Sequence, residues 1–164
     1  MNKLSFVPKH RSAPGDHPFV ESVVEFIESL EIEGNVFETE NEGEIVWQFP
    51  TPEEIGVCIQ FHRDDVGEIF FRLETVLAKI DSFTEFRVLR YLAGLNLKLR
   101  FPFRVGADGS HVFIQCRSYC DGFTKEHFKL RLQSLLPFSR EVQEDLMRNF
   151  GLSTALSKRS VIRK

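Results

Sequence analysis

The chain has 164 residues, 42% of them hydrophobic and 27% charged, and this composition excludes wholesale disorder. Its length suits one domain with tails, because a chain of about 150 residues buries roughly 68–70% of its unfolded surface. The formal net charge of −3 and the pI near 6.0 are unlike the basic balance of most nucleic-acid-binding domains.

Charge is unevenly distributed along the sequence. Residues 12–62 contain twelve acidic residues and no Lys or Arg, whereas residues 63–164 contain 18 basic and 12 acidic residues. We interpret this split as two faces of one domain, or as complementary surfaces in a dimer.

No apolar run approaches the roughly 18 residues that a transmembrane helix needs, and the first residues contain no hydrophobic stretch. We therefore expect neither a signal peptide nor a membrane anchor. Three cysteines are too few and odd in number for a disulfide framework, which favours a reducing compartment. The expected location is the cytoplasm.

The expected domain organisation is simple, since the chain has no repeat, no low-complexity tract and no long linker. Residues 1–16 are expected to form a flexible N-terminal tail and residues 152–164 a basic C-terminal tail. Residues 17–151 are expected to form a single domain.

The first elements follow from apolar spacing. Asp16 can cap a helix over residues 17–31 that has Pro18 in its first turn and ends at Gly34. Strand-like segments follow at 35–39, 44–49, 57–62 and 69–74, where apolar and polar residues alternate.

A second helix and a long strand are expected next. Ser82-x-x-Glu85 matches a capping box, which predicts a helix over residues 83–94. Gly94 and Asn96 are expected to stop this helix, and the alternation from Leu97 to Val105 predicts a strand.

Asp108-Gly109 predicts a tight hairpin, because both central positions of a type I′ turn need positive φ. With these two residues at the tip, each residue before the turn has a defined partner after it. The expected pairs are Val105 with Val112, Phe103 with Ile114, Phe101 with Cys116, Arg104 with Phe113, Pro102 with Gln115, Arg100 with Arg117 and Lys98 with Tyr119.

The third helix is expected to begin after Thr124, with Phe128 in its buried stripe. Pro137 is expected to interrupt it, Ser139 to cap a continuation, and Gly151 to end the fold. The whole pattern predicts an α+β domain: an antiparallel sheet of about five strands with helices on one face, in the order α-β-β-β-α-β-β-α.

This order of elements over residues 18–150 resembles the YbjN-like family of bacterial proteins, which are similar in fold to the class I type III secretion chaperones. The most specific local matches are Val112–Tyr119, then Gly122–Thr124 with Glu126 and Phe128, and the helix segment Leu89–Leu92 followed by Leu95 and Asn96. The resemblance implies a homodimer-capable scaffold without catalytic residues or a cofactor. It implies a function as a chaperone-like adaptor or regulator that binds a protein partner or client.

Metal and enzyme sites are not favoured by the residue spacing. Cys116 and Cys120 lie about 13 Å apart on a strand at roughly 3.3 Å per residue, which is too far to share one zinc ion. Their parity places both in the core, beside Phe101 and Leu97. No phosphate loop, G-x-S-x-G or H-E-x-x-H motif occurs, so we expect no catalytic site; an enzyme without a familiar motif stays open.

The outward sheet face is the candidate partner-binding site, because basic and aromatic side chains share it. Its predicted residues are Arg72, Lys98, Arg100, Arg104, Phe113, Arg117 and Tyr119, with Phe70 nearby. Arg100 opposite Arg117 is unfavourable unless an anion lies close.

Three interpretations of this face stay open. Carboxylates such as Glu74 can neutralise it, with Arg104 stacked on Phe113 as a cation–π pair. Alternatively, it receives an acidic segment of a protein partner. Basic residues among sheet aromatics are also typical of proteins that bind single-stranded nucleic acid.

Overall fold

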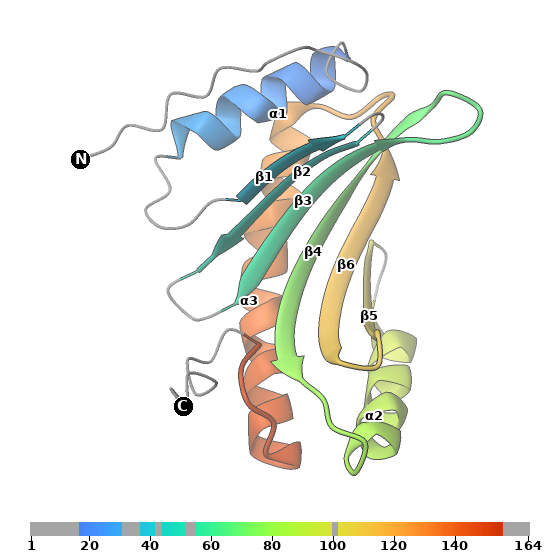
Figure 1. Cartoon of the computed structure of the whole chain (residues 1–164), viewed down its shortest axis with the longest axis vertical. Helices are drawn as coiled ribbons and strands as arrows, with labels where there is room; N and C mark the ends of the chain where they lie inside the picture. The colour runs from blue at the N-terminus through green and yellow to red at the C-terminus, as the bar shows by residue number, and fades with distance from the viewer. Residues whose placement is uncertain (1–16, 31–36, 42–43, 52–54, 100–101, 156–164) are drawn as a thin grey trace.

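The computed structural model describes residues 17–30, 37–41, 44–51, 55–99 and 102–155. Within these residues the chain forms three helices and one six-stranded antiparallel sheet of order β1-β2-β3-β4-β6-β5 (Figure 1). The elements are α1 (Pro18–Ser29), β1 (Phe37–Asn41), β2 (Glu44–Pro50), β3 (Gly56–Arg63), β4 (Ile69–Lys79), α2 (Glu85–Lys98), β5 (Phe103–Ala107), β6 (His111–Tyr119) and α3 (Lys125–Phe150).

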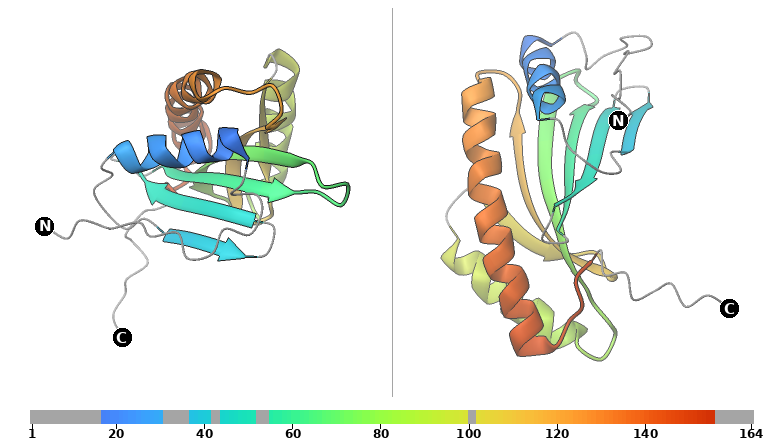
Figure 2. Two further views of the ribbon diagram at one scale, coloured as in Figure 1. Left: turned by 90° about the horizontal axis from the view of Figure 1, so that it is seen from above. Right: turned by 90° about the vertical axis from the view of Figure 1, so that its left-hand side faces the viewer.

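The expected α+β class is confirmed, including the antiparallel sheet with its helices on one face. The sheet has six strands rather than about five, because four strands, β1 to β4, lie between α1 and α2 where the expected order has three. Seen from above in Figure 2, the three helices lie on the same side of the sheet. The other face carries no helix from the described part of the chain.

Alternation within the strands explains this two-layer arrangement. On β3 and β4, every second side chain is buried and its neighbours are only half-buried. The buried side chains meet the apolar stripes of α1 and α3, where Phe19 contacts Phe61, Phe71 and Phe128 ring to ring. The sheet residues of this core include Ile45, Trp47, Val57, Ile59, Phe61, Phe71, Leu73, Val112 and Ile114.

Helix α1 begins close to the expected position. His17 is its N-cap, and the His17 ring nitrogen Nδ1 accepts a hydrogen bond from the Phe19 N–H at 3.2 Å, with Pro18 in the first turn. The expected cap, Asp16, lies outside the described residues.

Helix α2 differs from the expectation at both ends. Its N-cap is Thr84 rather than Ser82, and the Asp81 carboxylate accepts the Phe83 and Thr84 N–H groups in the turn before the helix. The helix also continues to Lys98 instead of stopping at Gly94. Asn96 donates to the Val105 carbonyl at 2.8 Å and accepts from the Val105 N–H at 2.9 Å, so its side chain docks the helix onto β5. The predicted strand from residue 97 is therefore wrong at its start.

The hairpin forms where expected, but its register differs by two residues. Phe103 lies opposite Cys116, Val105 opposite Ile114, and Ala107 opposite Val112. The Asp108 carboxylate accepts hydrogen bonds from the Ser110 N–H, the Ser110 hydroxyl and the His111 N–H. The Asp108 N–H donates to the His111 carbonyl, and Gly109 has a φ of 88°, so Gly109 and Ser110 are the central residues of the turn.

Helix α3 runs without interruption from Lys125 to Phe150, so the expected break at Pro137 is wrong. Thr124 caps its start as expected, and Gly151 ends it with a φ of 68°. Ser139 is fully buried within the helix, where its hydroxyl forms a 2.7 Å hydrogen bond with the hydroxyl of Thr75 on β4.

The first residues after α3 pack against the sheet. The Lys79 N–H donates to the Ser153 carbonyl, the Ala155 N–H donates to the Leu77 carbonyl, and the Leu152 side chain is buried. The segment 152–155 thus extends the structured part of the chain beyond Gly151. Residues 156–164 of the predicted tail, and residues 1–16, lie outside the described residues.

Candidate functional site

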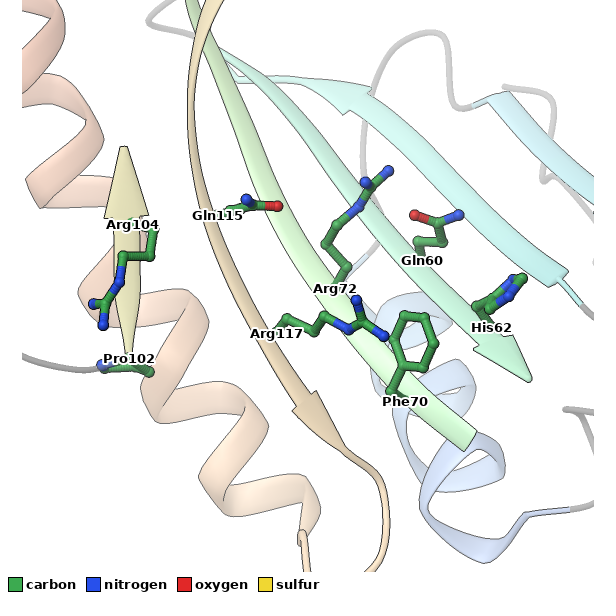
Figure 3. Close-up of a pocket in the computed structure, with 8 residues that line it drawn as sticks. All are labelled: Gln60, His62, Phe70, Arg72, Pro102, Arg104, Gln115 and Arg117. Carbon is green, nitrogen blue, oxygen red and sulfur yellow. The ribbon is translucent and has the colours of Figure 1, made fainter. Parts of the chain in front are cut away.

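The uncovered face of the sheet contains an open depression of about 430 Å³. Side chains from β3, β4, β6 and β5, together with the residue just before β5, line it on the side away from the helices (Figure 3). The lining residues are Gln60, His62, Phe70, Arg72, Pro102, Arg104, Gln115 and Arg117.

Arg117 is held by an aromatic stack. Its guanidinium carbon lies 3.7 Å from the centroid of the Phe70 ring, and Phe70 in turn contacts the His62 ring with centroids 5.1 Å apart. Such stacking fixes the plane of a guanidinium while leaving its edge N–H groups available. The side chain is therefore presented to the depression in a defined orientation.

Arg72 lies at the centre of this face, with Gln60 and Arg117 as its cross-strand neighbours. Its Nε atom is buried without a hydrogen-bond partner and lies 3.9 Å from a carboxylate oxygen of Glu74. Burial raises the pKa of the Glu74 carboxyl, and the nearby Arg72 offsets this rise only in part. Glu74 therefore neutralises one arginine of the face weakly.

Arg104 and Phe113 do not form the expected stacked pair. Arg104 lies opposite Gln115 and donates from Nη1 to the Phe103 carbonyl at 2.8 Å. Phe113 lies opposite Gly106 instead, and its ring covers the space that a Cβ at that position would fill, at 2.8 Å. The cation–π pair of this face is Arg117 with Phe70.

The structure brings together three of the seven predicted site residues in the depression: Arg72, Arg104 and Arg117. Phe113 lies on the same face outside the depression, and Tyr119 lies half-exposed at the end of β6, opposite Phe70. The remaining two do not contribute to the described face: Lys98 is the last residue of α2 and does not lie on the sheet, and Arg100 is outside the described residues.

Sequence reasoning missed the polar side chains that line the same depression. Gln60 and His62 alternate with buried residues on β3, and Gln115 does so on β6. Their positions in the alternating pattern of each strand already predict that these side chains point outward. What the sequence did not show is that β4 lies beside β6, which brings β3 within reach of the β5–β6 hairpin.

The cysteines lie in or near the core. Cys116 and Cys120 are buried, and burial raises the pKa of the Cys120 thiol to about 12. Burial also raises the pKa of the half-buried Cys58, next to the Glu74 carboxylate. Leu97, the expected neighbour of Cys120, is instead exposed on α2. Raised thiol pKa values keep these groups protonated and poorly nucleophilic.

Among the described residues, no cluster of three or more His, Cys, Asp or Glu side chains is arranged to hold a metal ion. None of the described helices is long and apolar enough to cross a lipid bilayer.

A second exposed feature lies on α2. One side of this helix has exposed apolar side chains at helical spacing, a pattern that is usually buried. They are Phe86, Leu89 and Leu97, which are 78%, 42% and 89% exposed. We call these three residues the α2 apolar face. Exposed apolar side chains that share one side of a helix often mark contact surfaces between proteins.

The chain is thus an α+β domain with helices on one face of an antiparallel sheet and an open, polar, arginine-bearing face on the other. This fold is similar to that of ExsC, a class I type III secretion chaperone. The match is to a chain in the crystal structure of the ExsC–ExsE complex, with a TM-score of 0.54 and 20% identity over 76% of this chain and 90% of that chain.

At this level of identity the comparison establishes the fold alone. It confirms the expected likeness to the secretion chaperones, whereas membership of the YbjN-like family stays a prediction. No protein-family model matches the chain, and no curated protein sequence matches it.

Proposed function

We propose that this chain is a non-catalytic, chaperone-like adaptor that binds a segment of a protein partner in the cytoplasm. The observation that carries the proposal is the fold similarity to ExsC, whose structure is known in complex with the protein ExsE. The open sheet face adds support, because no described helix covers it and its side chains offer both charged and aromatic contacts.

Affinity purification tests the proposal directly. The tagged full chain, expressed in its native cells, should retain one protein at a fixed stoichiometry, and the two purified proteins should re-form the complex when mixed. Protease treatment of the mixture should then protect a defined segment of the partner. Failure of the purified proteins to re-form a complex would contradict the proposal, as would turnover of a small molecule by the chain alone.

We further propose that the chain is a homodimer, supported by the exposed α2 apolar face. Burying Phe86 and Leu97 against a second copy would remove apolar surface from water, at about 25 cal/mol per Å². Light scattering of the purified chain should give twice the monomer mass. Phe86→Asp with Leu97→Asp should give the monomer mass, whereas Leu130→Asp, at another exposed apolar position on α3, should leave the dimer intact.

A further inference from the structure

The depression on the sheet face carries more positive charge than the described residues neutralise. Its described lining contains three arginines and no carboxylate, and the Arg72–Glu74 contact at 3.9 Å is the one ion pair that the described residues give to these arginines. Arg72 and Arg117 lie directly opposite each other on neighbouring strands. Like charges in this position repel, so an anion bound between them would stabilise the face.

The arginines are also held in place before any ligand arrives. The Phe70 ring supports the Arg117 guanidinium at 3.7 Å, and the Phe103 carbonyl accepts a hydrogen bond from Arg104 at 2.8 Å. A planar guanidinium that is already oriented loses little freedom when it donates two parallel hydrogen bonds to a carboxylate. The depression is therefore suited to a planar anion.

The shape of the depression favours an extended chain as the carrier of that anion. It crosses β3, β4, β6 and β5, which are separated by three strand spacings of about 4.8 Å, or roughly 14 Å in all. About four residues of extended peptide span this distance. The Gln60 and Gln115 amides and the Phe70 ring supply polar and apolar contacts along the path.

We infer that this depression is a carboxylate-binding site for an acidic, extended segment of the partner protein. The inference rests on the proposed function and names the chemistry of the partner. Arg117 binds an Asp or Glu side chain of the segment, and the neighbouring Arg72 adds positive charge beside it (Figure 3). Arg104, on β5, contacts a further acidic side chain along the segment.

Charge elsewhere in the chain favours a peptide over a nucleic acid. Residues 12–62 contain twelve acidic residues and no Lys or Arg, and β2 and β3 belong to this part of the sequence. Within the described part of this segment, Glu44 of β2 lies opposite His62 at the edge of the depression. A phosphate polymer that extends past His62 would meet this carboxylate, whereas an acidic side chain bound at Arg117 would not.

Fluorescence anisotropy with labelled peptides tests the site. A short peptide of alternating Asp and Ala should bind the full chain at least about tenfold more tightly than its amide analogue of alternating Asn and Ala. Arg117→Gln and Arg104→Gln should each weaken binding of the acidic peptide by about tenfold or more. Phe70→Leu, which keeps the charge and removes the aromatic support, should weaken it by a smaller factor.

Arg148→Gln is the matched control, because Arg148 is exposed on α3 and its replacement removes the same charge. Thermal melts should show that all four variants fold. Equal binding of the two peptides, or an equal loss of affinity in Arg148→Gln, would overturn the inference. Binding of an oligothymidylate but not of the acidic peptide would also overturn it, and would assign the face to nucleic acid.

The partner complex separates this inference from the proposed function. If the partner identified by affinity purification binds wild type and Arg117→Gln equally well, the carboxylate site is wrong while the adaptor function stands. If no partner re-forms a complex, the adaptor function itself is wrong, whatever the peptides do.

Discussion

The buried hydroxyl pair between β4 and α3 provides a test of how the long helix is placed. Thr75 and Ser139 are each fully buried, and their hydroxyl oxygens lie 2.7 Å apart. The pair can exist only if α3 passes Pro137 as one helix and presents Ser139 to the sheet. The pair also links α3 to β4, the strand that carries Arg72 and Glu74 on its opposite face.

The structure sets the size of the expected effects. Thr75→Val or Ser139→Ala removes one partner and leaves the other hydroxyl buried without a hydrogen bond, which costs about 1–3 kcal/mol. Replacing both groups removes the unsatisfied atom, so the double variant should cost about 1 kcal/mol less than the sum of the single changes. A loss of 1 kcal/mol corresponds to a melting shift of about 2–4 °C for a domain of this size.

Urea denaturation followed by tryptophan fluorescence measures these free energies, because Trp47 is the one Trp of the chain and is 1% exposed. The coupling between Thr75 and Ser139 should be clearly above the roughly 0.3–0.5 kcal/mol scatter of independent sites. Purely additive free energies would refute the reasoning. They would favour a helix that begins anew at Ser139, where the hydroxyl would cap the next turn instead of contacting the sheet.

Three further predictions concern single side chains. Burial raises the pKa of the Glu74 carboxyl in the folded chain. The stability of wild type relative to Glu74→Gln should therefore be greatest below pH 4.5 and should fall as the pH rises through the raised folded-state pKa. Urea titrations at a series of pH values measure this difference. Burial and the hydrogen bond to Asp145 raise the pKa of Tyr91 to about 12, so Tyr91→Phe should remove the phenol absorbance change near that pH. Gly106→Ala places a Cβ 2.8 Å from the Phe113 ring and should destabilise the chain by about 1–3 kcal/mol in thermal melts; Phe113→Ala in the same background should remove most of that added cost.

The sequence predicted those elements whose pattern is local and strong. The apolar stripe of α1 and the alternation on β3, β4 and β6 correspond to the buried residues of the structure. These periodicities arise because one face of each element must leave water, and that requirement acts on every turn or every second residue. The fold class could therefore be inferred without knowledge of the strand order.

The end of α2 could not be predicted from local rules. Gly94 and Asn96 are both residues that often end helices, yet the helix continues past them. The two hydrogen bonds between the Asn96 side chain and the Val105 backbone show why: the amide is satisfied by a residue nine positions away. Such a partner is visible only once the helix is docked on β5.

Pro137 illustrates the same limit in α3. A proline within a helix costs about 3 kcal/mol, and this rule predicts a break. On either side of it, however, Leu135 and Val142 are buried, as are Phe128, Leu132 and Leu146 along the same stripe. Burying each such side chain is worth about 1.5–3 kcal/mol, so continuity of the stripe outweighs one strained turn.

The size of the register error explains why two predicted site residues lie on the expected face although their cross-strand partners were predicted incorrectly. A shift of one residue moves every side chain to the other face of a sheet, but a shift of two restores each side chain to its face. Arg104 and Arg117 therefore point outward in both the expected and the observed register, although their opposite residues differ.

Prediction of a specific neighbour required more than parity. The sequence placed Arg117 opposite Arg100, its hairpin partner, whereas on its other side it lies opposite Arg72 of β4. The β4–β6 pairing joins segments separated by a helix and a strand, and no local signal specifies it. Because β6 lies between β4 and β5, Arg117 has Arg72 opposite it on β4, while Arg104 lies on β5 opposite Gln115. The like-charge contact that was expected within the hairpin is found instead between β4 and β6. This strand order, rather than the arginines alone, makes the depression extend across four strands, as the proposed peptide site requires.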